Sequence, residues 1–269
     1  MSLEQYYTEE VIGERLVAML PCSAPETCLE LSAGKGALLT PIIKKWPHIQ
    51  ISTCELDPEN NSFLKNNFSG KHFELDVISS TFDRAFKKEC SRFDLAVCNP
   101  PFSWRINSKY EKSSLKDFGM EWMCDWSKVR SEIIFIIQNL KLLKETGYLA
   151  IILPELIVFS DTFSKFREHL STFTSVISIS EVETGSFKGT EARTYILVLS
   201  KSRFNAPFSL TNGGQKTSMH SQNEFYSWSS KASKNSLFSL AESTFDLKRG
   251  KHSGKTLRHS NLAYYHTTG

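Results

Sequence analysis

The amino-acid sequence predicts an α/β protein built on a seven-stranded, mostly parallel sheet with an antiparallel hairpin at one edge. Along residues 26–153, short apolar runs alternate with helical patterns, which is typical of parallel strands joined by crossover helices. Two later apolar runs, 176–182 and 195–200, flank a loop bounded by glycines and indicate the hairpin. The chain has 269 residues, of which 40% are hydrophobic, and this is enough for a packed core.

Four polar residues mark the ends of the first four expected strands. In chain order they are Glu30, Glu55, Asp76 and Asn99, with spacings of 25, 21 and 23 residues. Each spacing leaves room for one crossover between parallel strands. Because open α/β sheets bind ligands at the carboxyl ends of their strands, we expect these four side chains to line one site. A carboxylate in the position of Glu55 can accept both hydroxyls of a ribose.

The segment Asp94–Phe102 carries the most specific motif. Its strand is expected to stop at Pro100 and Pro101, because proline lacks the N–H that a strand ladder needs. The Oδ1 atom of Asn99 and the carbonyl of Pro100 can each accept one hydrogen of an exocyclic amine. The ring of Phe102 can stack on the base that carries this amine. We therefore expect residues 99–102 to form the catalytic loop.

Residues 26–39 predict a strand, a tight turn and a helix. Gly34 and Gly36 allow the backbone of the turn to approach a ligand closely. The spacing differs from the dinucleotide-binding pattern G-x-G-x-x-G, because Leu39 stands where that pattern has its third glycine.

These two motifs carry a resemblance to a known family. Asn-Pro-Pro-Phe at 99–102 resembles the motif of the gamma-type DNA adenine-N6 methyltransferases of restriction-modification systems, and Glu-Leu-Ser-Ala-Gly-Lys-Gly at 30–36 resembles their first S-adenosylmethionine motif. The resemblance implies a Rossmann-like, class I S-adenosylmethionine-dependent methyltransferase domain over residues 1–203. It also implies methyl transfer to N6 of an adenine flipped out of double-stranded DNA, without a metal ion. This chain departs from many relatives at Leu31, where they have proline, and at Lys35, where they have a shorter side chain.

The same resemblance implies the roles of individual residues. Glu30 would lie near the amino-acid part of the cofactor, Glu55 at its ribose and Asp76 at its adenine amine. Phe102 and Phe187 would stack on the two faces of the target base. The full set implied to bind S-adenosylmethionine is Tyr7, Thr8, Glu30, Ser32, Ala33, Gly34, Gly36, Glu55, Asp76 and Asn99.

Other segments give less specific expectations. Residues 103–131, rich in aromatic side chains, are interpreted as a mobile flap over the substrate, with a packed helical excursion as the alternative. A helix is expected over 131–146, ended by Gly147. Residues 204–235 are polar and read as a linker. Residues 236–269 resemble the opening of a target-recognition domain and are expected to be only part of one.

Charge is distributed unevenly along the chain. Residues 201–269 contain 10 Lys and Arg against 3 Asp and Glu. This suits contact with phosphates, although a solvated tail has the same composition. Six cysteines without metal-binding spacing, no secretion signal and no apolar run near the roughly 20 residues of a membrane span indicate a cytoplasmic protein.

Two alternatives stay open from the sequence. RNA and protein-glutamine methyltransferases share Asn-Pro-Pro-Tyr loops, and a relative without catalytic activity could still bind DNA. Phe102 in place of tyrosine and the basic tail favour DNA. The expected partners are double-stranded DNA and either a specificity subunit or a C-terminal recognition domain.

Overall fold

The computed structural model describes residues 10–102, 105–106, 112–182, 193–212 and 216–227. Its contacts divide the chain into two units, residues 1–229 and 230–269, and every described residue belongs to the first. The predictions for Tyr7, Thr8, Phe187 and residues 236–269 therefore lie outside the described residues.

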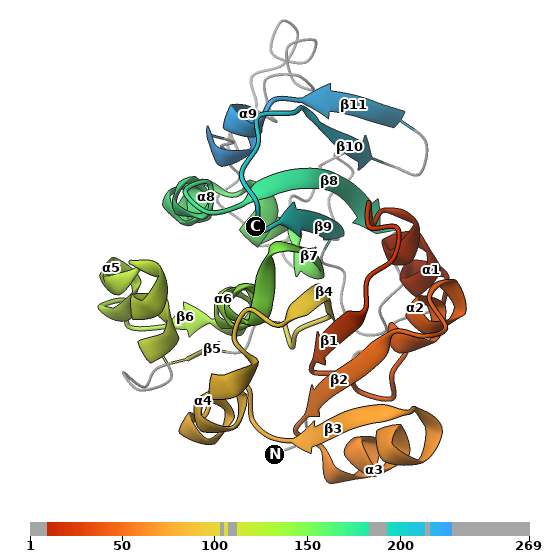
Figure 1. Cartoon of the computed structure of the whole chain (residues 1–269). Helices are drawn as coiled ribbons and strands as arrows, with labels where there is room; N and C mark the ends of the chain where they lie inside the picture. Colours follow the sequence, from red (N-terminus) through yellow and green to blue (C-terminus); the bar gives the residue numbers. More distant parts are fainter. Residues whose placement is uncertain (1–9, 103–104, 107–111, 183–192, 213–215, 228–269) are drawn as a thin grey trace, which may run out of the picture. The chain divides into compact units, whose positions relative to one another are not determined.

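A nine-stranded sheet forms the centre of this unit, in the order β11-β10-β8-β9-β7-β4-β1-β2-β3 (Figure 1). All of its strands run parallel except β9 and β11. A separate antiparallel pair joins β5 to β6. The strands are β1 Thr27–Leu31, β2 Gln50–Glu55, β3 Gly70–Glu74, β4 Phe93–Cys98, β5 Arg105–Ile106, β6 Val129–Arg130, β7 Leu143–Pro154, β8 Ser175–Val182, β9 Thr194–Ser200, β10 Phe208–Asn212 and β11 Lys216–His220.

The seven strands expected from the sequence are all present, and β9 is the antiparallel strand of the expected hairpin. Two further strands, β10 and β11, extend the sheet beyond β8, and α9 (Gln222–Ser227) follows them. This part of the chain was expected to be a linker because it has few apolar residues. Phe208 and Leu210 alternate with polar residues and are buried, and Leu210 pairs with Ile179 of β8. This alternation is a strand pattern that the linker interpretation overlooked.

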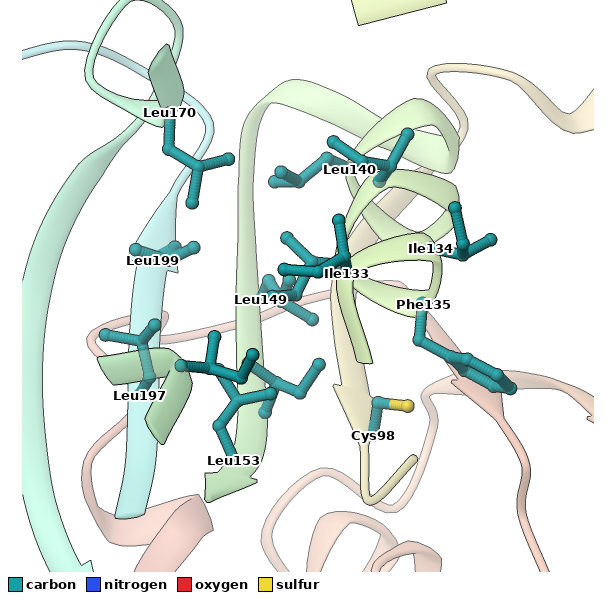
Figure 2. Close-up of a cluster of buried hydrophobic side chains, with 14 of the residues drawn as sticks. Cys98, Ile133, Ile134, Phe135, Leu140, Leu149, Leu153, Leu170, Leu197 and Leu199 are labelled. Atoms are coloured by element: carbon teal, nitrogen blue, oxygen red, sulfur yellow. The ribbon is translucent and has the colours of Figure 1, made fainter. Parts of the chain in front are cut away.

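Helices cover both faces of the sheet. One buried apolar cluster joins the sheet to α1 (Glu10–Ala18), α2 (Leu39–Lys45) and α3 (Pro58–Asn67). The other joins it to α4 (Ser80–Phe86), α6 (Ser131–Leu142), α7 (Glu155–Phe159) and α8 (Ser164–Leu170). In Figure 2, Ile133 of α6 lies beside Leu149 of β7, within the second cluster. The remaining short helices are η1 Lys87–Glu89, η2 Ser113–Phe118, α5 Glu121–Cys124 and η3 Asp161–Phe163.

The helix expected over 131–146 ends one turn earlier than predicted. Helix α6 ends at Leu142, and Leu143 already pairs with Phe93 of β4. Gly147 lies inside β7 and does not end the helix. A Cβ at this glycine would stand 3.0 Å from the carbonyl oxygen of Phe93, so the absence of a side chain permits the close approach of the two strands.

The flap expected over 103–131 is also wrong for its described part, residues 105–106 and 112–131. Leu115, Met120 and Met123 are fully buried, so this segment is the packed excursion that was the alternative. The Nζ atom of Lys112 donates to the carbonyl of Trp126 at 2.6 Å and closes the excursion on itself. Among the helices that the structure describes, none has the length and apolar character to cross a membrane.

Candidate active site

The direction in which strands are added to the sheet reverses at β1. Strands β2 and β3 lie on one side of β1, and β4 lies on its other side. In open α/β sheets such a switch point leaves a crevice at the carboxyl ends of the two central strands. Here the register pairs Glu30 of β1 with Val97 of β4, so both strands end side by side. The loops that follow them carry most of the predicted site.

The loop after β1 is tied to β2. The backbone N–H groups of Ser32 and Ala33 both donate to the carbonyl of Cys54, at 2.8 and 3.2 Å. Ser32 has a φ of 61°, which is uncommon for a residue with a side chain. Such a conformation persists only where surrounding contacts hold it, and the two hydrogen bonds to Cys54 supply that hold.

The two glycines of this loop have different surroundings. Both have positive φ values, 54° for Gly34 and 77° for Gly36. A Cβ at Gly36 would lie 2.6 Å from the ring of Phe68, so any other residue there requires this half-buried ring to move. A Cβ at Gly34 would meet nothing within 4 Å. Gly36 therefore allows the loop to pack closely against Phe68, whereas Gly34 borders open space at the crevice.

Glu55, the last residue of β2, contacts this loop directly. Its Oε2 accepts the backbone N–H of Gly34 at 2.6 Å, and its Oε1 accepts the N–H of Asp57 at 2.9 Å. Each carboxylate oxygen has two lone pairs, so the group keeps capacity for further donors such as ribose hydroxyls. The structure thus brings Glu55 and the glycine loop together, as the sequence predicts.

Glu30 is buried within β1. Its side chain is 2% exposed, and its Oε2 has no hydrogen-bond partner among the described residues. Burial raises the pKa of this carboxyl well above its usual value, and the negative charge of Glu55 raises it further. A buried carboxyl without a partner is costly, and a cationic or hydrogen-bonding ligand group would compensate for this cost.

Asp76 lies two residues beyond β3 and is half-buried. Its Oδ1 accepts the N–H of Ile78 at 3.1 Å, and its carbonyl accepts the hydroxyl of Ser79 at 2.7 Å. These contacts shape the turn that leads into α4. The N–H of Leu75, its neighbour, donates to the carbonyl of Glu55 at 3.2 Å, so Asp76 follows a residue attached to the same strand end. Its role toward an adenine amine stays a prediction.

The Asn-Pro-Pro-Phe loop follows β4 and lies beside the loop after β1. The hydroxyl oxygen of Ser32 is 3.1 Å from the carbonyl oxygen of Asn99, but its shorter bond, at 2.5 Å, is to the carbonyl of Leu31 in its own strand. Pro100 is buried, and Phe102 is half-buried against the cluster formed with α1 and α2. The Oδ1 atom of Asn99 is shielded from solvent. An amine must therefore reach it from within the site, or the amide must rotate about its terminal torsion.

A residue that the sequence analysis missed holds the other side of this loop. The hydroxyl of Ser131, at the start of α6, donates to the carbonyl of Pro101 at 2.7 Å. A buried ion pair between Arg130 and Glu132 flanks it. The sequence does show a charged and polar triplet, 130–132, directly before the apolar run of α6. It does not show that Ser131 of this triplet bonds to Pro101, which lies 30 residues earlier in the chain.

The strand order β3-β2-β1-β4-β7-β9-β8, with these loops at the switch point, defines a class I methyltransferase fold. A solved methyltransferase subunit of a type I restriction-modification system from Streptococcus thermophilus has the same fold, with a TM-score of 0.63 and 16% identity, over 90% of this chain and 54% of that one. The chain belongs to the N-6 DNA Methylase family, whose model matches residues 2–236.

Two relatives illustrate the range of similar proteins. The Type II methyltransferase M.HincII of Haemophilus influenzae is 25% identical over 185 residues, which are 67% of this chain and 34% of that protein. The tRNA1(Val) (adenine(37)-N6)-methyltransferase of Flavobacterium psychrophilum is 25% identical over 189 residues, which are 67% of this chain and 73% of that protein. The chain thus spans about a third of the type II enzyme that it matches.

S-adenosylmethionine is the expected cofactor of this fold and family, and the residues present fit it. Glu30 offers a buried oxygen that lacks a partner, which suits a cationic group. Gly34 borders open space where a ligand can approach the backbone. Glu55 stands beside Gly34 with acceptor capacity suited to ribose hydroxyls. Among the predicted strand-end residues, Glu55 contacts this loop directly, Glu30 precedes it in β1, and Asn99 follows the adjacent strand β4.

Proposed function

We propose that the chain is a DNA methyltransferase that transfers a methyl group from S-adenosylmethionine to N6 of adenine, as part of a restriction-modification system. One observation carries the proposal. The expected cofactor loop and the amine-binding loop follow the adjacent strands β1 and β4, and the hydroxyl oxygen of Ser32 lies 3.1 Å from the carbonyl oxygen of Asn99. Groups for the cofactor and for the base therefore lie on two neighbouring loops. The family and its restriction-modification relatives support DNA as the substrate.

The residues of the chain act mainly by positioning in this mechanism. The bound cofactor supplies a methyl group on a positively charged sulfur, which is already a good electrophile. Asn99 and the carbonyl of Pro100 accept the two amine hydrogens of the adenine, which draws the nitrogen lone pair out of the ring system. Phe102 stacks on the base, which must leave the duplex to reach the loop. Correct placement of the two reactants then accounts for most of the rate.

A second candidate is methylation of adenine N6 in RNA. The relative from Flavobacterium psychrophilum is named a tRNA methyltransferase, and the match covers 73% of its length. The corresponding share for the type II DNA methyltransferase is 34%. The amine chemistry at Asn99 would be the same for either nucleic acid, so the substrate must be decided by experiment.

The test offers S-adenosylmethionine with a labelled methyl group together with unmethylated plasmid DNA or tRNA. We expect label in DNA as N6-methyladenine, identified by mass spectrometry of the digested nucleosides. Asn99→Ala should reduce this transfer at least about 100-fold, because the amine loses its main acceptor. Asn67→Ala is the matched control, since Asn67 is exposed and its side chain donates to the carbonyl of Phe63 in its own helix. Label found in tRNA alone would replace the proposal by the second candidate.

The partner and the location follow from this proposal. Double-stranded DNA is the expected ligand, and a specificity subunit or a recognition domain would select its sequence. A cytoplasmic location agrees with such a role and stays a prediction.

A further inference from the structure

We propose that Ser131 is a positioning residue, which fixes the backbone of Pro101 and thereby the place where Phe102 stacks on the target base. The buried pair of Arg130 and Glu132 directs the hydroxyl of Ser131 to this task. The inference rests on the proposed function for the identity of the base. The restraint of the Pro101 backbone by Ser131 can, however, be measured without catalysis.

The Pro-Pro loop offers few main-chain hydrogen-bonding groups. Pro100 and Pro101 have no backbone N–H, so their carbonyls are the only main-chain hydrogen-bonding groups that they offer. The ring of Pro101 sets its φ at about −65°. Its ψ sets the direction of its carbonyl and of the chain that leaves toward Phe102. The hydrogen bond from Ser131 to this carbonyl, at 2.7 Å, restrains that remaining torsion. Both backbone torsions of Pro101 are then restrained.

The hydroxyl hydrogen of Ser131 has two acceptors within reach. A serine hydroxyl has one hydrogen to donate, and the Oε2 of Glu132 stands 3.4 Å from it as a competing acceptor. Arg130 donates through its Nε to both carboxylate oxygens of Glu132, at 3.2 and 3.3 Å. The ion pair neutralises the carboxylate and leaves the shorter bond to Pro101 as the better one. Ser131 and Glu132 are both fully buried, so water does not compete for either group.

Contacts restrain the chain on both sides of the Pro-Pro loop. Strand β6 pairs with β5, which places Val129 opposite Ile106 and Arg130 opposite Arg105. The chain before the loop is held at the end of β4, where the thiol of Cys98 donates to the carbonyl of Leu31 at 3.0 Å. The segment 129–132 thus holds the loop at Pro101 and the chain beyond it at β5. A segment that is used only to begin a helix does not need this second contact.

The test compares Ser131→Ala with Ser175→Ala. Both changes remove a buried serine hydroxyl that bonds to the backbone of another segment. Ser175, the first residue of β8, bonds to the backbone of Phe204, which lies between β9 and β10. A fluorine probe, 4-fluorophenylalanine placed at position 102 alone, reports the conformations of that ring by NMR. The affinity for S-adenosylmethionine and kcat on unmethylated plasmid DNA or tRNA are measured on the same proteins without the probe.

We expect Ser131→Ala to broaden or split the single fluorine resonance and to lower kcat about 10-fold, since misplacement of reactants costs up to about 100-fold. The dissociation constant for S-adenosylmethionine should change less than about twofold. Ser175→Ala should change none of these quantities. An unchanged fluorine spectrum in Ser131→Ala, or an equal loss of kcat in both variants, would overturn the inference. If neither nucleic acid is methylated by the parent protein, the proposed function fails, whereas a change in the spectrum specific to Ser131→Ala still supports the hold.

Discussion

The backbone N–H of Gly34 donates to the Oε2 of Glu55 at 2.6 Å, and this bond joins the loop after β1 to the end of β2. The other oxygen of Glu55 accepts the N–H of Asp57, which also caps α3 through its own side chain. One carboxylate therefore organises the glycine loop and the start of a helix. A group already oriented by two backbone donors loses little entropy when a ligand hydroxyl adds to it.

Glu55→Gln should weaken S-adenosylmethionine binding at least about 10-fold. The amide keeps the shape of the carboxylate, but its NH2 group must face either Gly34 or Asp57, both of which present N–H donors. Isothermal titration with the cofactor measures the effect. Glu74→Gln is the control, because Glu74 pairs with Glu55 in the register of β2 and β3 but is exposed. Equal losses in both variants would contradict a specific role for Glu55.

Alanine at the two loop glycines should have contrasting effects. Gly36→Ala brings a methyl group within 2.6 Å of Phe68 and should cost about 2–4 kcal/mol of unfolding free energy. Gly34→Ala meets no atom within 4 Å and should cost only about 1 kcal/mol, from its positive φ. Its methyl group would, however, enter the space expected for the cofactor and weaken cofactor binding.

Gly119→Ala provides the matched control for these variants. Gly119 has a φ of 68°, and a Cβ there would first meet His169 at 3.5 Å, an ordinary contact. It should lose as much stability as Gly34→Ala and bind the cofactor like the parent protein. Chemical denaturation and cofactor titration separate the two effects. Normal cofactor binding by Gly34→Ala would show that the ligand does not use this side of the loop.

Glu30→Gln should stabilise the protein in the absence of cofactor, increasingly so as the pH rises. Burial raises the pKa of Glu30 in the folded state above its unfolded value of about 4.3, so folding favours its neutral form. The parent protein therefore loses stability as the pH rises above that unfolded value, and the loss levels off above the raised folded pKa. Glutamine is neutral throughout and avoids this loss.

The same variant should bind S-adenosylmethionine roughly 10- to 100-fold more weakly, because a hydrogen bond to a charged group is lost. Urea unfolding at a series of pH values measures the first effect, and titration measures the second. A stability difference between variant and parent that is independent of pH would show that Glu30 does not titrate in the folded protein.

The strand ends were predictable because each combines an apolar run with one polar residue. Glu55 and Asn99 stand directly at or after such runs, and their positions at the sheet edge follow from parallel pairing alone. The same reasoning fails where a distant partner decides the local structure. Leu143 continues the apolar pattern of α6, but it pairs with Phe93 of β4 and the helix ends one residue earlier.

The part of the site formed by side chains could not be predicted to the same degree. Ser131 is an ordinary residue for the start of a helix, and its bond to Pro101 depends on how α6 packs beside β4. Strand β10 was not predicted for a related reason, because Leu210 becomes buried only when β10 pairs with β8. Local patterns report which residues prefer burial or a turn, whereas partners far apart in sequence are selected by the assembled fold.

Removing one partner of the buried pair Arg130–Glu132 should lower the free energy of unfolding, whereas replacing both partners by apolar residues should not. Their side chains are 7% and 0% exposed, so neither charge is solvated by bulk water. Glu132→Gln leaves the guanidinium buried without its counter-charge and should lower the free energy of unfolding by about 3 kcal/mol. Arg130→Met combined with Glu132→Leu removes both charges and should recover most of this loss, because neither desolvation penalty remains. Urea unfolding of both proteins measures the difference. The double variant should keep its methyl transfer, because it also removes the competing acceptor Glu132 and leaves the bond from Ser131 to Pro101 in place. If the double variant is as unstable as Glu132→Gln, the pair stabilises the fold beyond the cost of burying it, and its role is structural.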